Sequence, residues 1–235
     1  AFAILRAQNV VAPSLLNTDG TIEEIGLEDA DQPIVYVVVK RTINSATKYY
    51  LENFDDNYTT DSAIQFSGGT LPGTTTVTGL GHLEGEVVKV IADDAELADK
   101  TVASGQIIID RVPTTYLEIG LKYPTFTDDL VGNATKTTPL IRTMPVETRL
   151  PSGPVTGIRK RIVQVNAVLD DSQNLVINGD PIPFRKLDAA ILDSGVAFFT
   201  GTKRSGAFLG YDFDGQIEIT QDAPLYFTLL ALDYR

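Results

Sequence analysis

The single histidine of the chain is the first residue whose chemistry has to be weighed. His82 lies in the segment Gly79-Leu-Gly-His-Leu-Glu-Gly-Glu86, where Glu84 and Glu86 are near enough in sequence to orient its ring. An imidazole titrates near neutral pH and therefore suits a general base. No nucleophile motif of the Gly-x-Ser-x-Gly kind accompanies it, and the histidine precedes a predicted strand at a turn flanked by glycines. We expect a structural histidine that bonds to a backbone carbonyl.

Acidic residues match metal and glycosidase patterns only in part. Segments 17–20 (Asn-Thr-Asp-Gly) and 212–215 (Asp-Phe-Asp-Gly) resemble the start of a calcium loop, but neither continues with the remaining oxygen ligands. We predict that both are Asx–Gly turns that lead into strands. Adjacent carboxylates are too numerous for one pair to be singled out for glycoside hydrolysis, and neighbours on a strand point to opposite faces. These pairs are Asp55/Asp56, Asp93/Asp94, Asp128/Asp129 and Asp170/Asp171.

The composition excludes several classes of chemistry. The 235 residues include no cysteine and one histidine, so thiol nucleophiles, disulfides and multi-histidine metal sites are ruled out. A net charge of −12 argues against tight binding to a nucleic-acid backbone. No apolar stretch approaches the ~20 residues of a membrane span, and no nucleotide-binding fingerprint is present. We expect no enzymatic activity, no cofactor and no metal.

Residue usage predicts an all-β fold. The chain holds 26 Thr, 20 Val and 19 Ile, which suit a pleated surface, and Gly and Pro interrupt it too often for long helices. Helix is expected only over 56–65 and 187–192. We expect strand 33–39 to be buried on both faces and to pair with 49–54 through a turn at Asn44–Ala46. The other predicted strands are 85–92, 106–110, 116–121, 158–169, 216–220 and 225–232.

Two stretches rich in Thr and Gly, 70–78 and 132–138, are candidate domain joints. We predict that residues 76–137 form an inserted small β-barrel subdomain. Residues 1–75 and 138–235 would then form one discontinuous main domain of β-propeller-blade or sandwich-like sheets. The charge balance changes near the second joint, because residues 1–129 carry 20 acidic and 8 basic side chains and residues 130–235 carry 11 of each.

The segment Thr76 to Asp93 resembles a motif of the tail tubular protein B, or nozzle, family of short-tailed bacteriophages. In that family a Gly-Leu-x-His-Leu-Glu-Gly-Glu stretch precedes a hydrophobic strand, and further segments of this chain match in the expected order over roughly residues 33–232. The chain departs from the pattern at Ala92–Ala95, where the family has a glycine in the turn. The motif residues here are Gly79, Leu80, His82, Leu83, Glu84, Gly85 and Glu86.

The resemblance implies a non-enzymatic virion protein of the phage tail. Its subunits would form a homo-oligomeric ring, a hexamer by analogy with the family, in contact with other tail proteins. Genomic DNA would pass through this ring without specific binding, and no catalytic residue is implied. Family members are much longer, and because the chain lacks an initiating methionine we interpret it as a C-terminal piece of such a protein.

Basic side chains cluster only in the last part of the sequence. They are either solvated strand faces or contacts to acidic neighbours in the ring. The candidate contact residues are Arg159, Lys160, Arg161, Lys203 and Arg204, with Arg185 and Lys186 as a further cluster.

Two other functions remain open at this point. A carbohydrate-binding or adhesin-like β module would depend on exposed tyrosines such as Tyr49, Tyr58 or Tyr116. A glycan depolymerase, the weakest alternative, would need a carboxylate pair in a groove.

Overall fold

The computed structural model describes residues 2–5, 10–29, 34–128, 134–136, 139–145, 149–150, 153–154, 158–185, 194–206 and 210–235. Strands account for 53% of the chain and helix for 3%, which confirms the predicted all-β class. Helical structure in the described residues consists of two 3-10 turns, η2 (Gly68–Thr70) and η3 (Gly81–Leu83). No helix in this part of the chain is long and apolar enough to cross a membrane.

The first sheet is built around a β-hairpin. Its strands are β3 (Thr21–Glu28), β4 (Ile34–Ile43) and β5 (Ala46–Asn53), in that order. Asn44 and Ser45 connect β4 to β5 with positive φ angles of 49° and 61°, the two-residue geometry that matches strand twist. The predicted hairpin is therefore confirmed.

Burial along β4 differs from the prediction. Val37 and Val39 are buried, but residues 34–36 and Val38 are only partly so. Burial on both faces was therefore the wrong expectation, because the rest of the chain covers the side of β4 that carries Val37, Val39 and Arg41 and leaves the side of Lys40 open.

The second unit is a four-stranded sheet with the order β6-β11-β8-β9, next to the strand pair β7–β10. Twelve buried apolar residues form its core, and Ile64 and Phe66 of β6 pack against them. The predicted helix at 56–65 is wrong, because alternating Ile64 and Phe66 place β6 in this sheet as a strand. The strands are β6 (Asp61–Ser67), β7 (Thr76–Thr78), β8 (Val87–Ala92), β9 (Ala95–Thr101), β10 (Gln106–Ile108) and β11 (Tyr116–Leu121).

The C-terminal part has two sheets that share a second core. The sheet β20-β17-β22 contributes Val165, Ala167 and Leu169, and the sheet β14-β21-β18-β19 contributes Ile177 and Ile219. The strands are β14 (Leu140–Arg142), β17 (Gln164–Ser172), β18 (Val176–Ile177), β19 (Asp180–Pro181), β20 (Phe199–Gly206), β21 (Glu218–Thr220) and β22 (Thr228–Tyr234).

Three short pairs complete the strand inventory of the described residues. They are β1 (Phe2–Leu5) with β2 (Val10–Pro13), β12 (Phe126–Asp128) with β13 (Ala134–Lys136), and β15 (Arg149–Leu150) with β16 (Gly153–Pro154). The strand predicted to begin at 158 begins at Gln164 instead. Residues 158–163 are not part of the strand, and the backbone of Lys160 forms an isolated bridge with Asp212. The second helix candidate, 187–192, lies outside the described residues.

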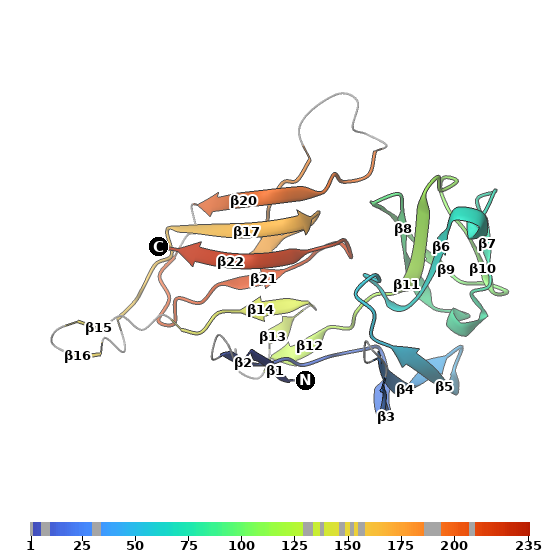
Figure 1. The fold of residues 1–235 in the computed structure, drawn as a ribbon, viewed down its shortest axis with the longest axis horizontal. Coiled ribbons are helices and arrows are strands. Elements are labelled where there is room, and N and C mark those ends of the chain that lie inside the picture. Colours follow the sequence, from blue (N-terminus) through green and yellow to red (C-terminus); the bar gives the residue numbers. More distant parts are fainter. Residues whose placement is uncertain are drawn as a thin grey trace.

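The β6–β11 unit and the C-terminal sheets lie at opposite ends of the long axis of the molecule (Figure 1). Backbone N–H of Val196 donates to the carbonyl of Asp94 at 2.9 Å, and the Tyr226 hydroxyl donates to the carbonyl of Asn57 at 2.7 Å. These contacts join the C-terminal part to the second unit. The predicted subdomain boundary at residue 76 falls between β6 and β7, which serve one core, and the division into domains stays a prediction.

Candidate functional site

The segment Gly79–Glu86 enters the core of the second unit through the η3 turn. Leu80 and Leu83 are both fully buried in this core. Gly79 and Gly85 flank the turn with φ angles of 92° and 82°, a region that favours glycine. The motif therefore places two leucine anchors between β7 and β8.

His82 faces backbone groups of neighbouring strands. Its Nε2 lies 3.4 Å from the carbonyl oxygen of Ser62, which confirms the predicted contact with a backbone carbonyl. The Tyr50 hydroxyl donates to the His82 carbonyl at 3.0 Å. The Ser62 hydroxyl donates to Glu52 at 3.0 Å. Its proton is therefore directed at Glu52 and not at His82, as it would be in a histidine-activated nucleophile.

The two glutamates of the motif bind backbone groups of other residues and make no contact with the imidazole ring. The Glu84 carboxylate accepts the backbone N–H groups of Ser104 and Gly105 at 2.8 and 2.6 Å. Both of these residues have positive φ, so Glu84 holds the tight turn between β9 and β10. The Glu86 backbone N–H donates to the Leu83 carbonyl, and the Glu86 carbonyl accepts the Val102 N–H, both at 3.0 Å.

The most concentrated group of buried charges surrounds Arg41, which is 2% exposed. Its guanidinium donates to Glu52 at 3.0 and 2.8 Å and to Asp61 at 3.1 and 3.0 Å. It also donates to the Thr18 hydroxyl at 2.7 Å and to the Asp19 carbonyl. Burial lowers the pKa of Arg41, but the hydrogen bonds to Glu52 and Asp61 outweigh it and hold the pKa above its ordinary value. One guanidinium therefore connects the segment before β3 with β4, β5 and β6.

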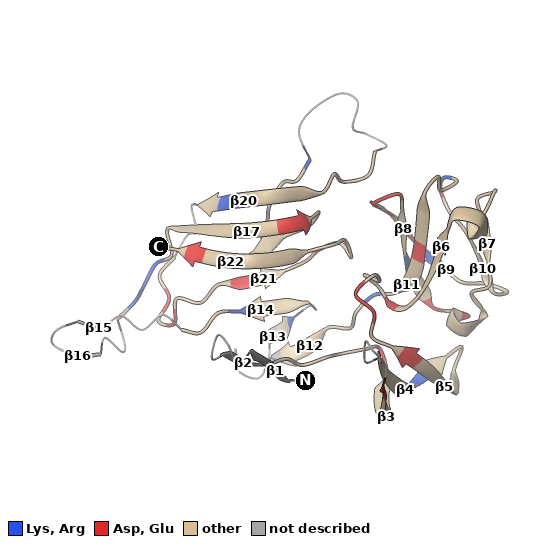
Figure 2. Ribbon diagram, viewed as in Figure 1, with Lys and Arg blue, Asp and Glu red and all other residues tan. Residues whose placement is uncertain are grey.

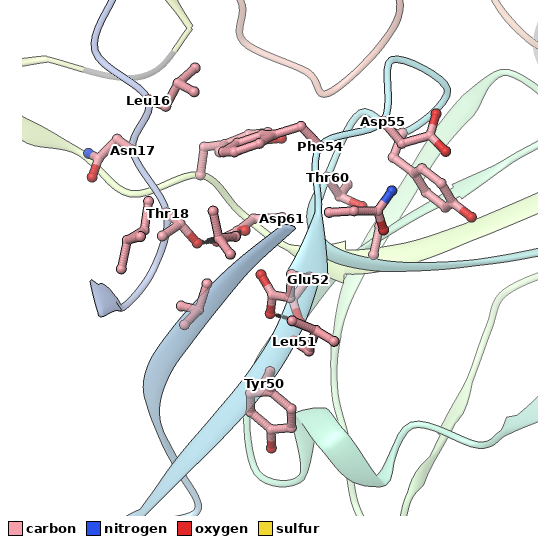
Figure 3. A pocket seen from close by; sticks show the side chains of 18 of the residues that line it. Leu16, Asn17, Thr18, Tyr50, Leu51, Glu52, Phe54, Asp55, Thr60 and Asp61 are labelled. Carbon is pink, nitrogen blue, oxygen red and sulfur yellow. Dashed lines mark hydrogen bonds between the residues drawn. The ribbon is translucent and has the colours of Figure 1, made fainter. Parts of the chain in front are cut away.

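A pocket of about 420 Å³ opens beside this group. Figure 3 shows Thr18 and Asp61 pointing toward each other, with the Phe54 ring nearby. Burial, followed by the charges of Asp61 and Glu118, raises the pKa of Tyr123 to about 12, so its hydroxyl stays protonated. The lining is Leu16, Asn17, Thr18, Ile22, Val37, Val39, Tyr50, Leu51, Glu52, Asn53, Phe54, Asp55, Tyr58, Thr60, Asp61, Ser62, Ala63, His82 and Tyr123.

The carboxylates of the pocket have partners within the chain. Glu52 and Asp61 bind Arg41, and Asp55 accepts the backbone and side-chain N–H groups of Asn57 at 2.9 and 2.7 Å. Most glycosidases use one carboxyl group that can give a proton and another that can take one or attack. Within the described residues that line the pocket, the carboxylates are bound to Arg41 and Asn57 and are not arranged as such a pair.

A second buried carboxylate, Glu118, joins β11 to the start of β6. It is fully buried, and one oxygen accepts the backbone and hydroxyl hydrogens of Thr59 and Thr60 at 2.7–3.1 Å. The other oxygen accepts the Tyr116 hydroxyl at 3.2 Å. Burial, reinforced by Glu118, raises the pKa of Tyr116 above its ordinary value.

The turn at Ala92–Ala95, where a glycine was expected, is formed by Asp93 and Asp94 with φ angles of 51° and 61°. Asp93 accepts the backbone N–H groups of Thr114, Thr115 and Tyr116 at 2.7–3.2 Å. Burial raises the pKa of this carboxyl, but the hydrogen bonds from Thr115 and Thr114 outweigh it and hold the pKa well below its ordinary value. The local bonds of Asp93 thus stabilise a turn that lacks glycine.

The two Asx–Gly segments bend the backbone ahead of β3 and β21. Gly20 and Gly215 have φ angles of 155° and 59°. Gly20 directly precedes β3, and the Asp19 N–H donates to Asp61 at 2.8 Å. Within the described residues, no group of three His, Cys, Asp or Glu side chains could hold a metal ion.

The five candidate contact residues have different surroundings. Lys203 donates to the Pro183 carbonyl at 2.8 Å and lies 4.3 Å from the Phe199 ring centroid, and Arg204 donates to Gln164. Arg159 and Arg161 are exposed, and the Arg159 guanidinium lies 5.2 Å from the Phe213 ring centroid. Lys203 and Arg204 therefore make contacts within the C-terminal unit, whereas Arg159 and Arg161 lie at the surface of the segment before β17.

Comparison with known proteins adds no relative to these observations. No protein-family model matches this chain, and no curated protein matches it either. What the chain does must therefore be argued from its own residues.

Proposed function

We propose that this chain is a non-enzymatic structural component of a bacteriophage tail, part of the nozzle ring through which DNA leaves the virion. The proposal is carried by the structural role of the motif Gly79–Glu86, which resembles the nozzle family. Its leucines are buried in the core, and its Glu84 and His82 bind backbone groups. A motif used in this way is consistent with an assembly protein and supplies no reaction.

The charge distribution supports the same proposal. Residues 1–129 carry a net charge of −12, and a lumen of that sign would repel phosphates weakly and let DNA pass. Basic partners for this acidic part would come from residues 158–163 of an adjacent subunit.

The protein content of purified phage particles tests the proposal. Mass spectrometry of virions whose genome encodes this chain should detect it at a stoichiometry of several copies per particle. Its absence from particles, with the protein found only in the lysate, would reject the virion role.

A carbohydrate-binding function is the second candidate, and the pocket favours it. Three tyrosines, Tyr50, Tyr58 and Tyr123, line it together with Phe54 and the amides of Asn17 and Asn53. Aromatic rings and amides are groups that bind sugars. Titration with oligosaccharides, read from pocket resonances in NMR spectra, would show saturable shifts if this function were correct.

A further inference from the structure

We infer that the open face of the β3–β4–β5 sheet binds the Arg159–Arg161 segment of a second copy of this chain, in a head-to-tail contact. The inference rests on the proposed function, because it names the surfaces by which neighbouring subunits of the ring would meet. It is carried by two exposed surfaces of opposite charge on one chain.

The first surface, called the outer face, is the side of the β3–β4–β5 sheet opposite to Val37, Val39 and Arg41. Strand register places Val38 next to Leu51 and Lys40 next to Tyr49 on this side. Leu51 is 72% exposed and Tyr49 61% exposed. The outer face consists of Glu24, Glu28, Tyr36, Val38, Lys40, Tyr49 and Leu51.

Carboxylates border this apolar centre along the edge strand β3. Glu24 and Glu28 are exposed, and Glu28 accepts the Tyr36 hydroxyl at 3.1 Å. The positive charge of Lys40 is balanced by Glu23, whose Oε1 lies 3.8 Å from the Lys40 Nζ. The outer face therefore combines large apolar side chains with an acidic rim, the composition of a surface made for a basic and aromatic partner.

The second surface, called the basic end, is formed where the segment before β17 meets residues 211–213. The backbone bridge between Lys160 and Asp212 sets these two segments antiparallel, so that Arg159 and Arg161 alternate with Lys160 and flank the bridge together with Tyr211 and Phe213. Tyr211 is 65% exposed and Phe213 50% exposed. The basic end thus presents two arginines with two aromatic rings, which are residues enriched at binding hot spots.

Because of where the two surfaces lie on the molecule, a contact between them joins two copies of the chain. The basic segment before β17 and the β3–β5 sheet lie in opposite halves of the molecule (Figure 2). A contact between two different surfaces is heterologous, and it generates a ring when the rotation between copies closes. Two glutamates on one surface meet two arginines on the other, with apolar side chains on both.

Three variants test this pairing by sedimentation velocity at low salt, from about 10 µM to about 1 mM protein, the range in which a few exposed contacts act. Glu24→Lys with Glu28→Lys reverses the outer face, and Arg159→Glu with Arg161→Glu reverses the basic end. The third variant carries all four changes. Asp56→Lys and Lys122→Glu, at exposed positions away from both surfaces, are the controls.

Wild type and controls should associate reversibly. Each double variant alone should associate with an affinity lower by about tenfold or more. An equimolar mixture of the two double variants should recover association, because the native basic end of one variant meets the native outer face of the other and the two reversed surfaces also complement each other. The fourfold variant should regain self-association through the reversed charges.

The inference is overturned if wild type stays monomeric throughout this range, if the double variants associate like wild type, or if their mixture stays monomeric. These outcomes can be told apart from a failure of the proposed function. A chain found in virions whose variants still associate leaves the tail role intact and rejects the surface. Loss and rescue of association in a chain absent from virions keeps the surface and rejects the tail role.

Discussion

Replacing Arg41 by Met should destabilise the N-terminal part of the protein more than any exposed charge substitution. The side chain is 2% exposed and binds two carboxylates, a threonine hydroxyl and a backbone carbonyl. Methionine has a similar reach but leaves Asp61, which is itself buried, without a counter-charge. Unpaired buried charge is the main source of the expected loss.

The magnitude follows from this geometry. Removing one partner of a buried ion pair costs about 3–5 kcal/mol, and for a chain of this size each kcal/mol lowers Tm by about 2–4 °C. Arg41→Met should therefore lower Tm by about 6–20 °C. Lys40→Met is the matched control, because Lys40 and its partner Glu23 are 44% and 43% exposed and such pairs contribute about 0–1 kcal/mol.

Urea unfolding measures the difference in the free energy of unfolding between these variants. It can be followed by far-ultraviolet circular dichroism and by tyrosine fluorescence, because the chain has no tryptophan. A triple variant that adds Glu52→Gln and Asp61→Asn should recover much of the loss, because it removes the unpaired charges. If Arg41→Met and Lys40→Met cost the same, or if the triple variant is less stable than Arg41→Met, the argument from buried charge is refuted.

Four further predictions concern other parts of the chain. Gly120→Ala should cost about 1–3 kcal/mol in urea unfolding, because its Cβ would lie 2.7 Å from the Asp61 carbonyl oxygen and closer still to the Thr60 hydroxyl; a neutral substitution would contradict this packing. Asp93→Asn should be less stable than wild type at neutral pH. Since the folded-state pKa of Asp93 is depressed, that difference should be complete above about pH 5 and shrink as acid protonates the carboxylate, and a difference independent of pH would contradict the account. His82→Ala should change stability modestly and abolish no reaction, and glycan cleavage that disappears in this variant would overturn the non-enzymatic function. The chain should show no measurable affinity for duplex DNA at physiological salt, and submicromolar binding with a steep salt dependence would contradict the acidic-conduit argument.

Local sequence signals predicted much of the fold. The apolar run after Pro33, the polar Asn44–Ser45 turn and the tyrosine-rich strand that follows are neighbours in sequence, so their hairpin could be read directly. The strand 116–121 was predicted with its observed bounds, and in the structure five consecutive residues from Leu117 are buried. Residues 56–65 were misassigned because strand pairing with β11, more than fifty residues away, determines their structure.

The charged centre could not be predicted in the same way. Arg41, Glu52 and Asp61 come from three strands of two different sheets, and only the folded chain brings them together. A partial signal was present, because Arg41 occupies an inward position of the alternation between Val39 and Ile43. Glu118 gave a similar signal, since it lies between the buried residues Leu117 and Ile119. Charged residues at core positions indicate a buried partner without identifying it.

Electron cryomicroscopy of the phage particles is the most direct test of the proposal that this chain is a structural part of the tail. The account predicts that the β6–β11 unit and the C-terminal sheets fit density in a ring around the axial channel at the tail end, with the outer face of one copy against the basic end of the next. Density for the chain in a peripheral receptor-binding fibre, or its absence from the tail, would contradict it.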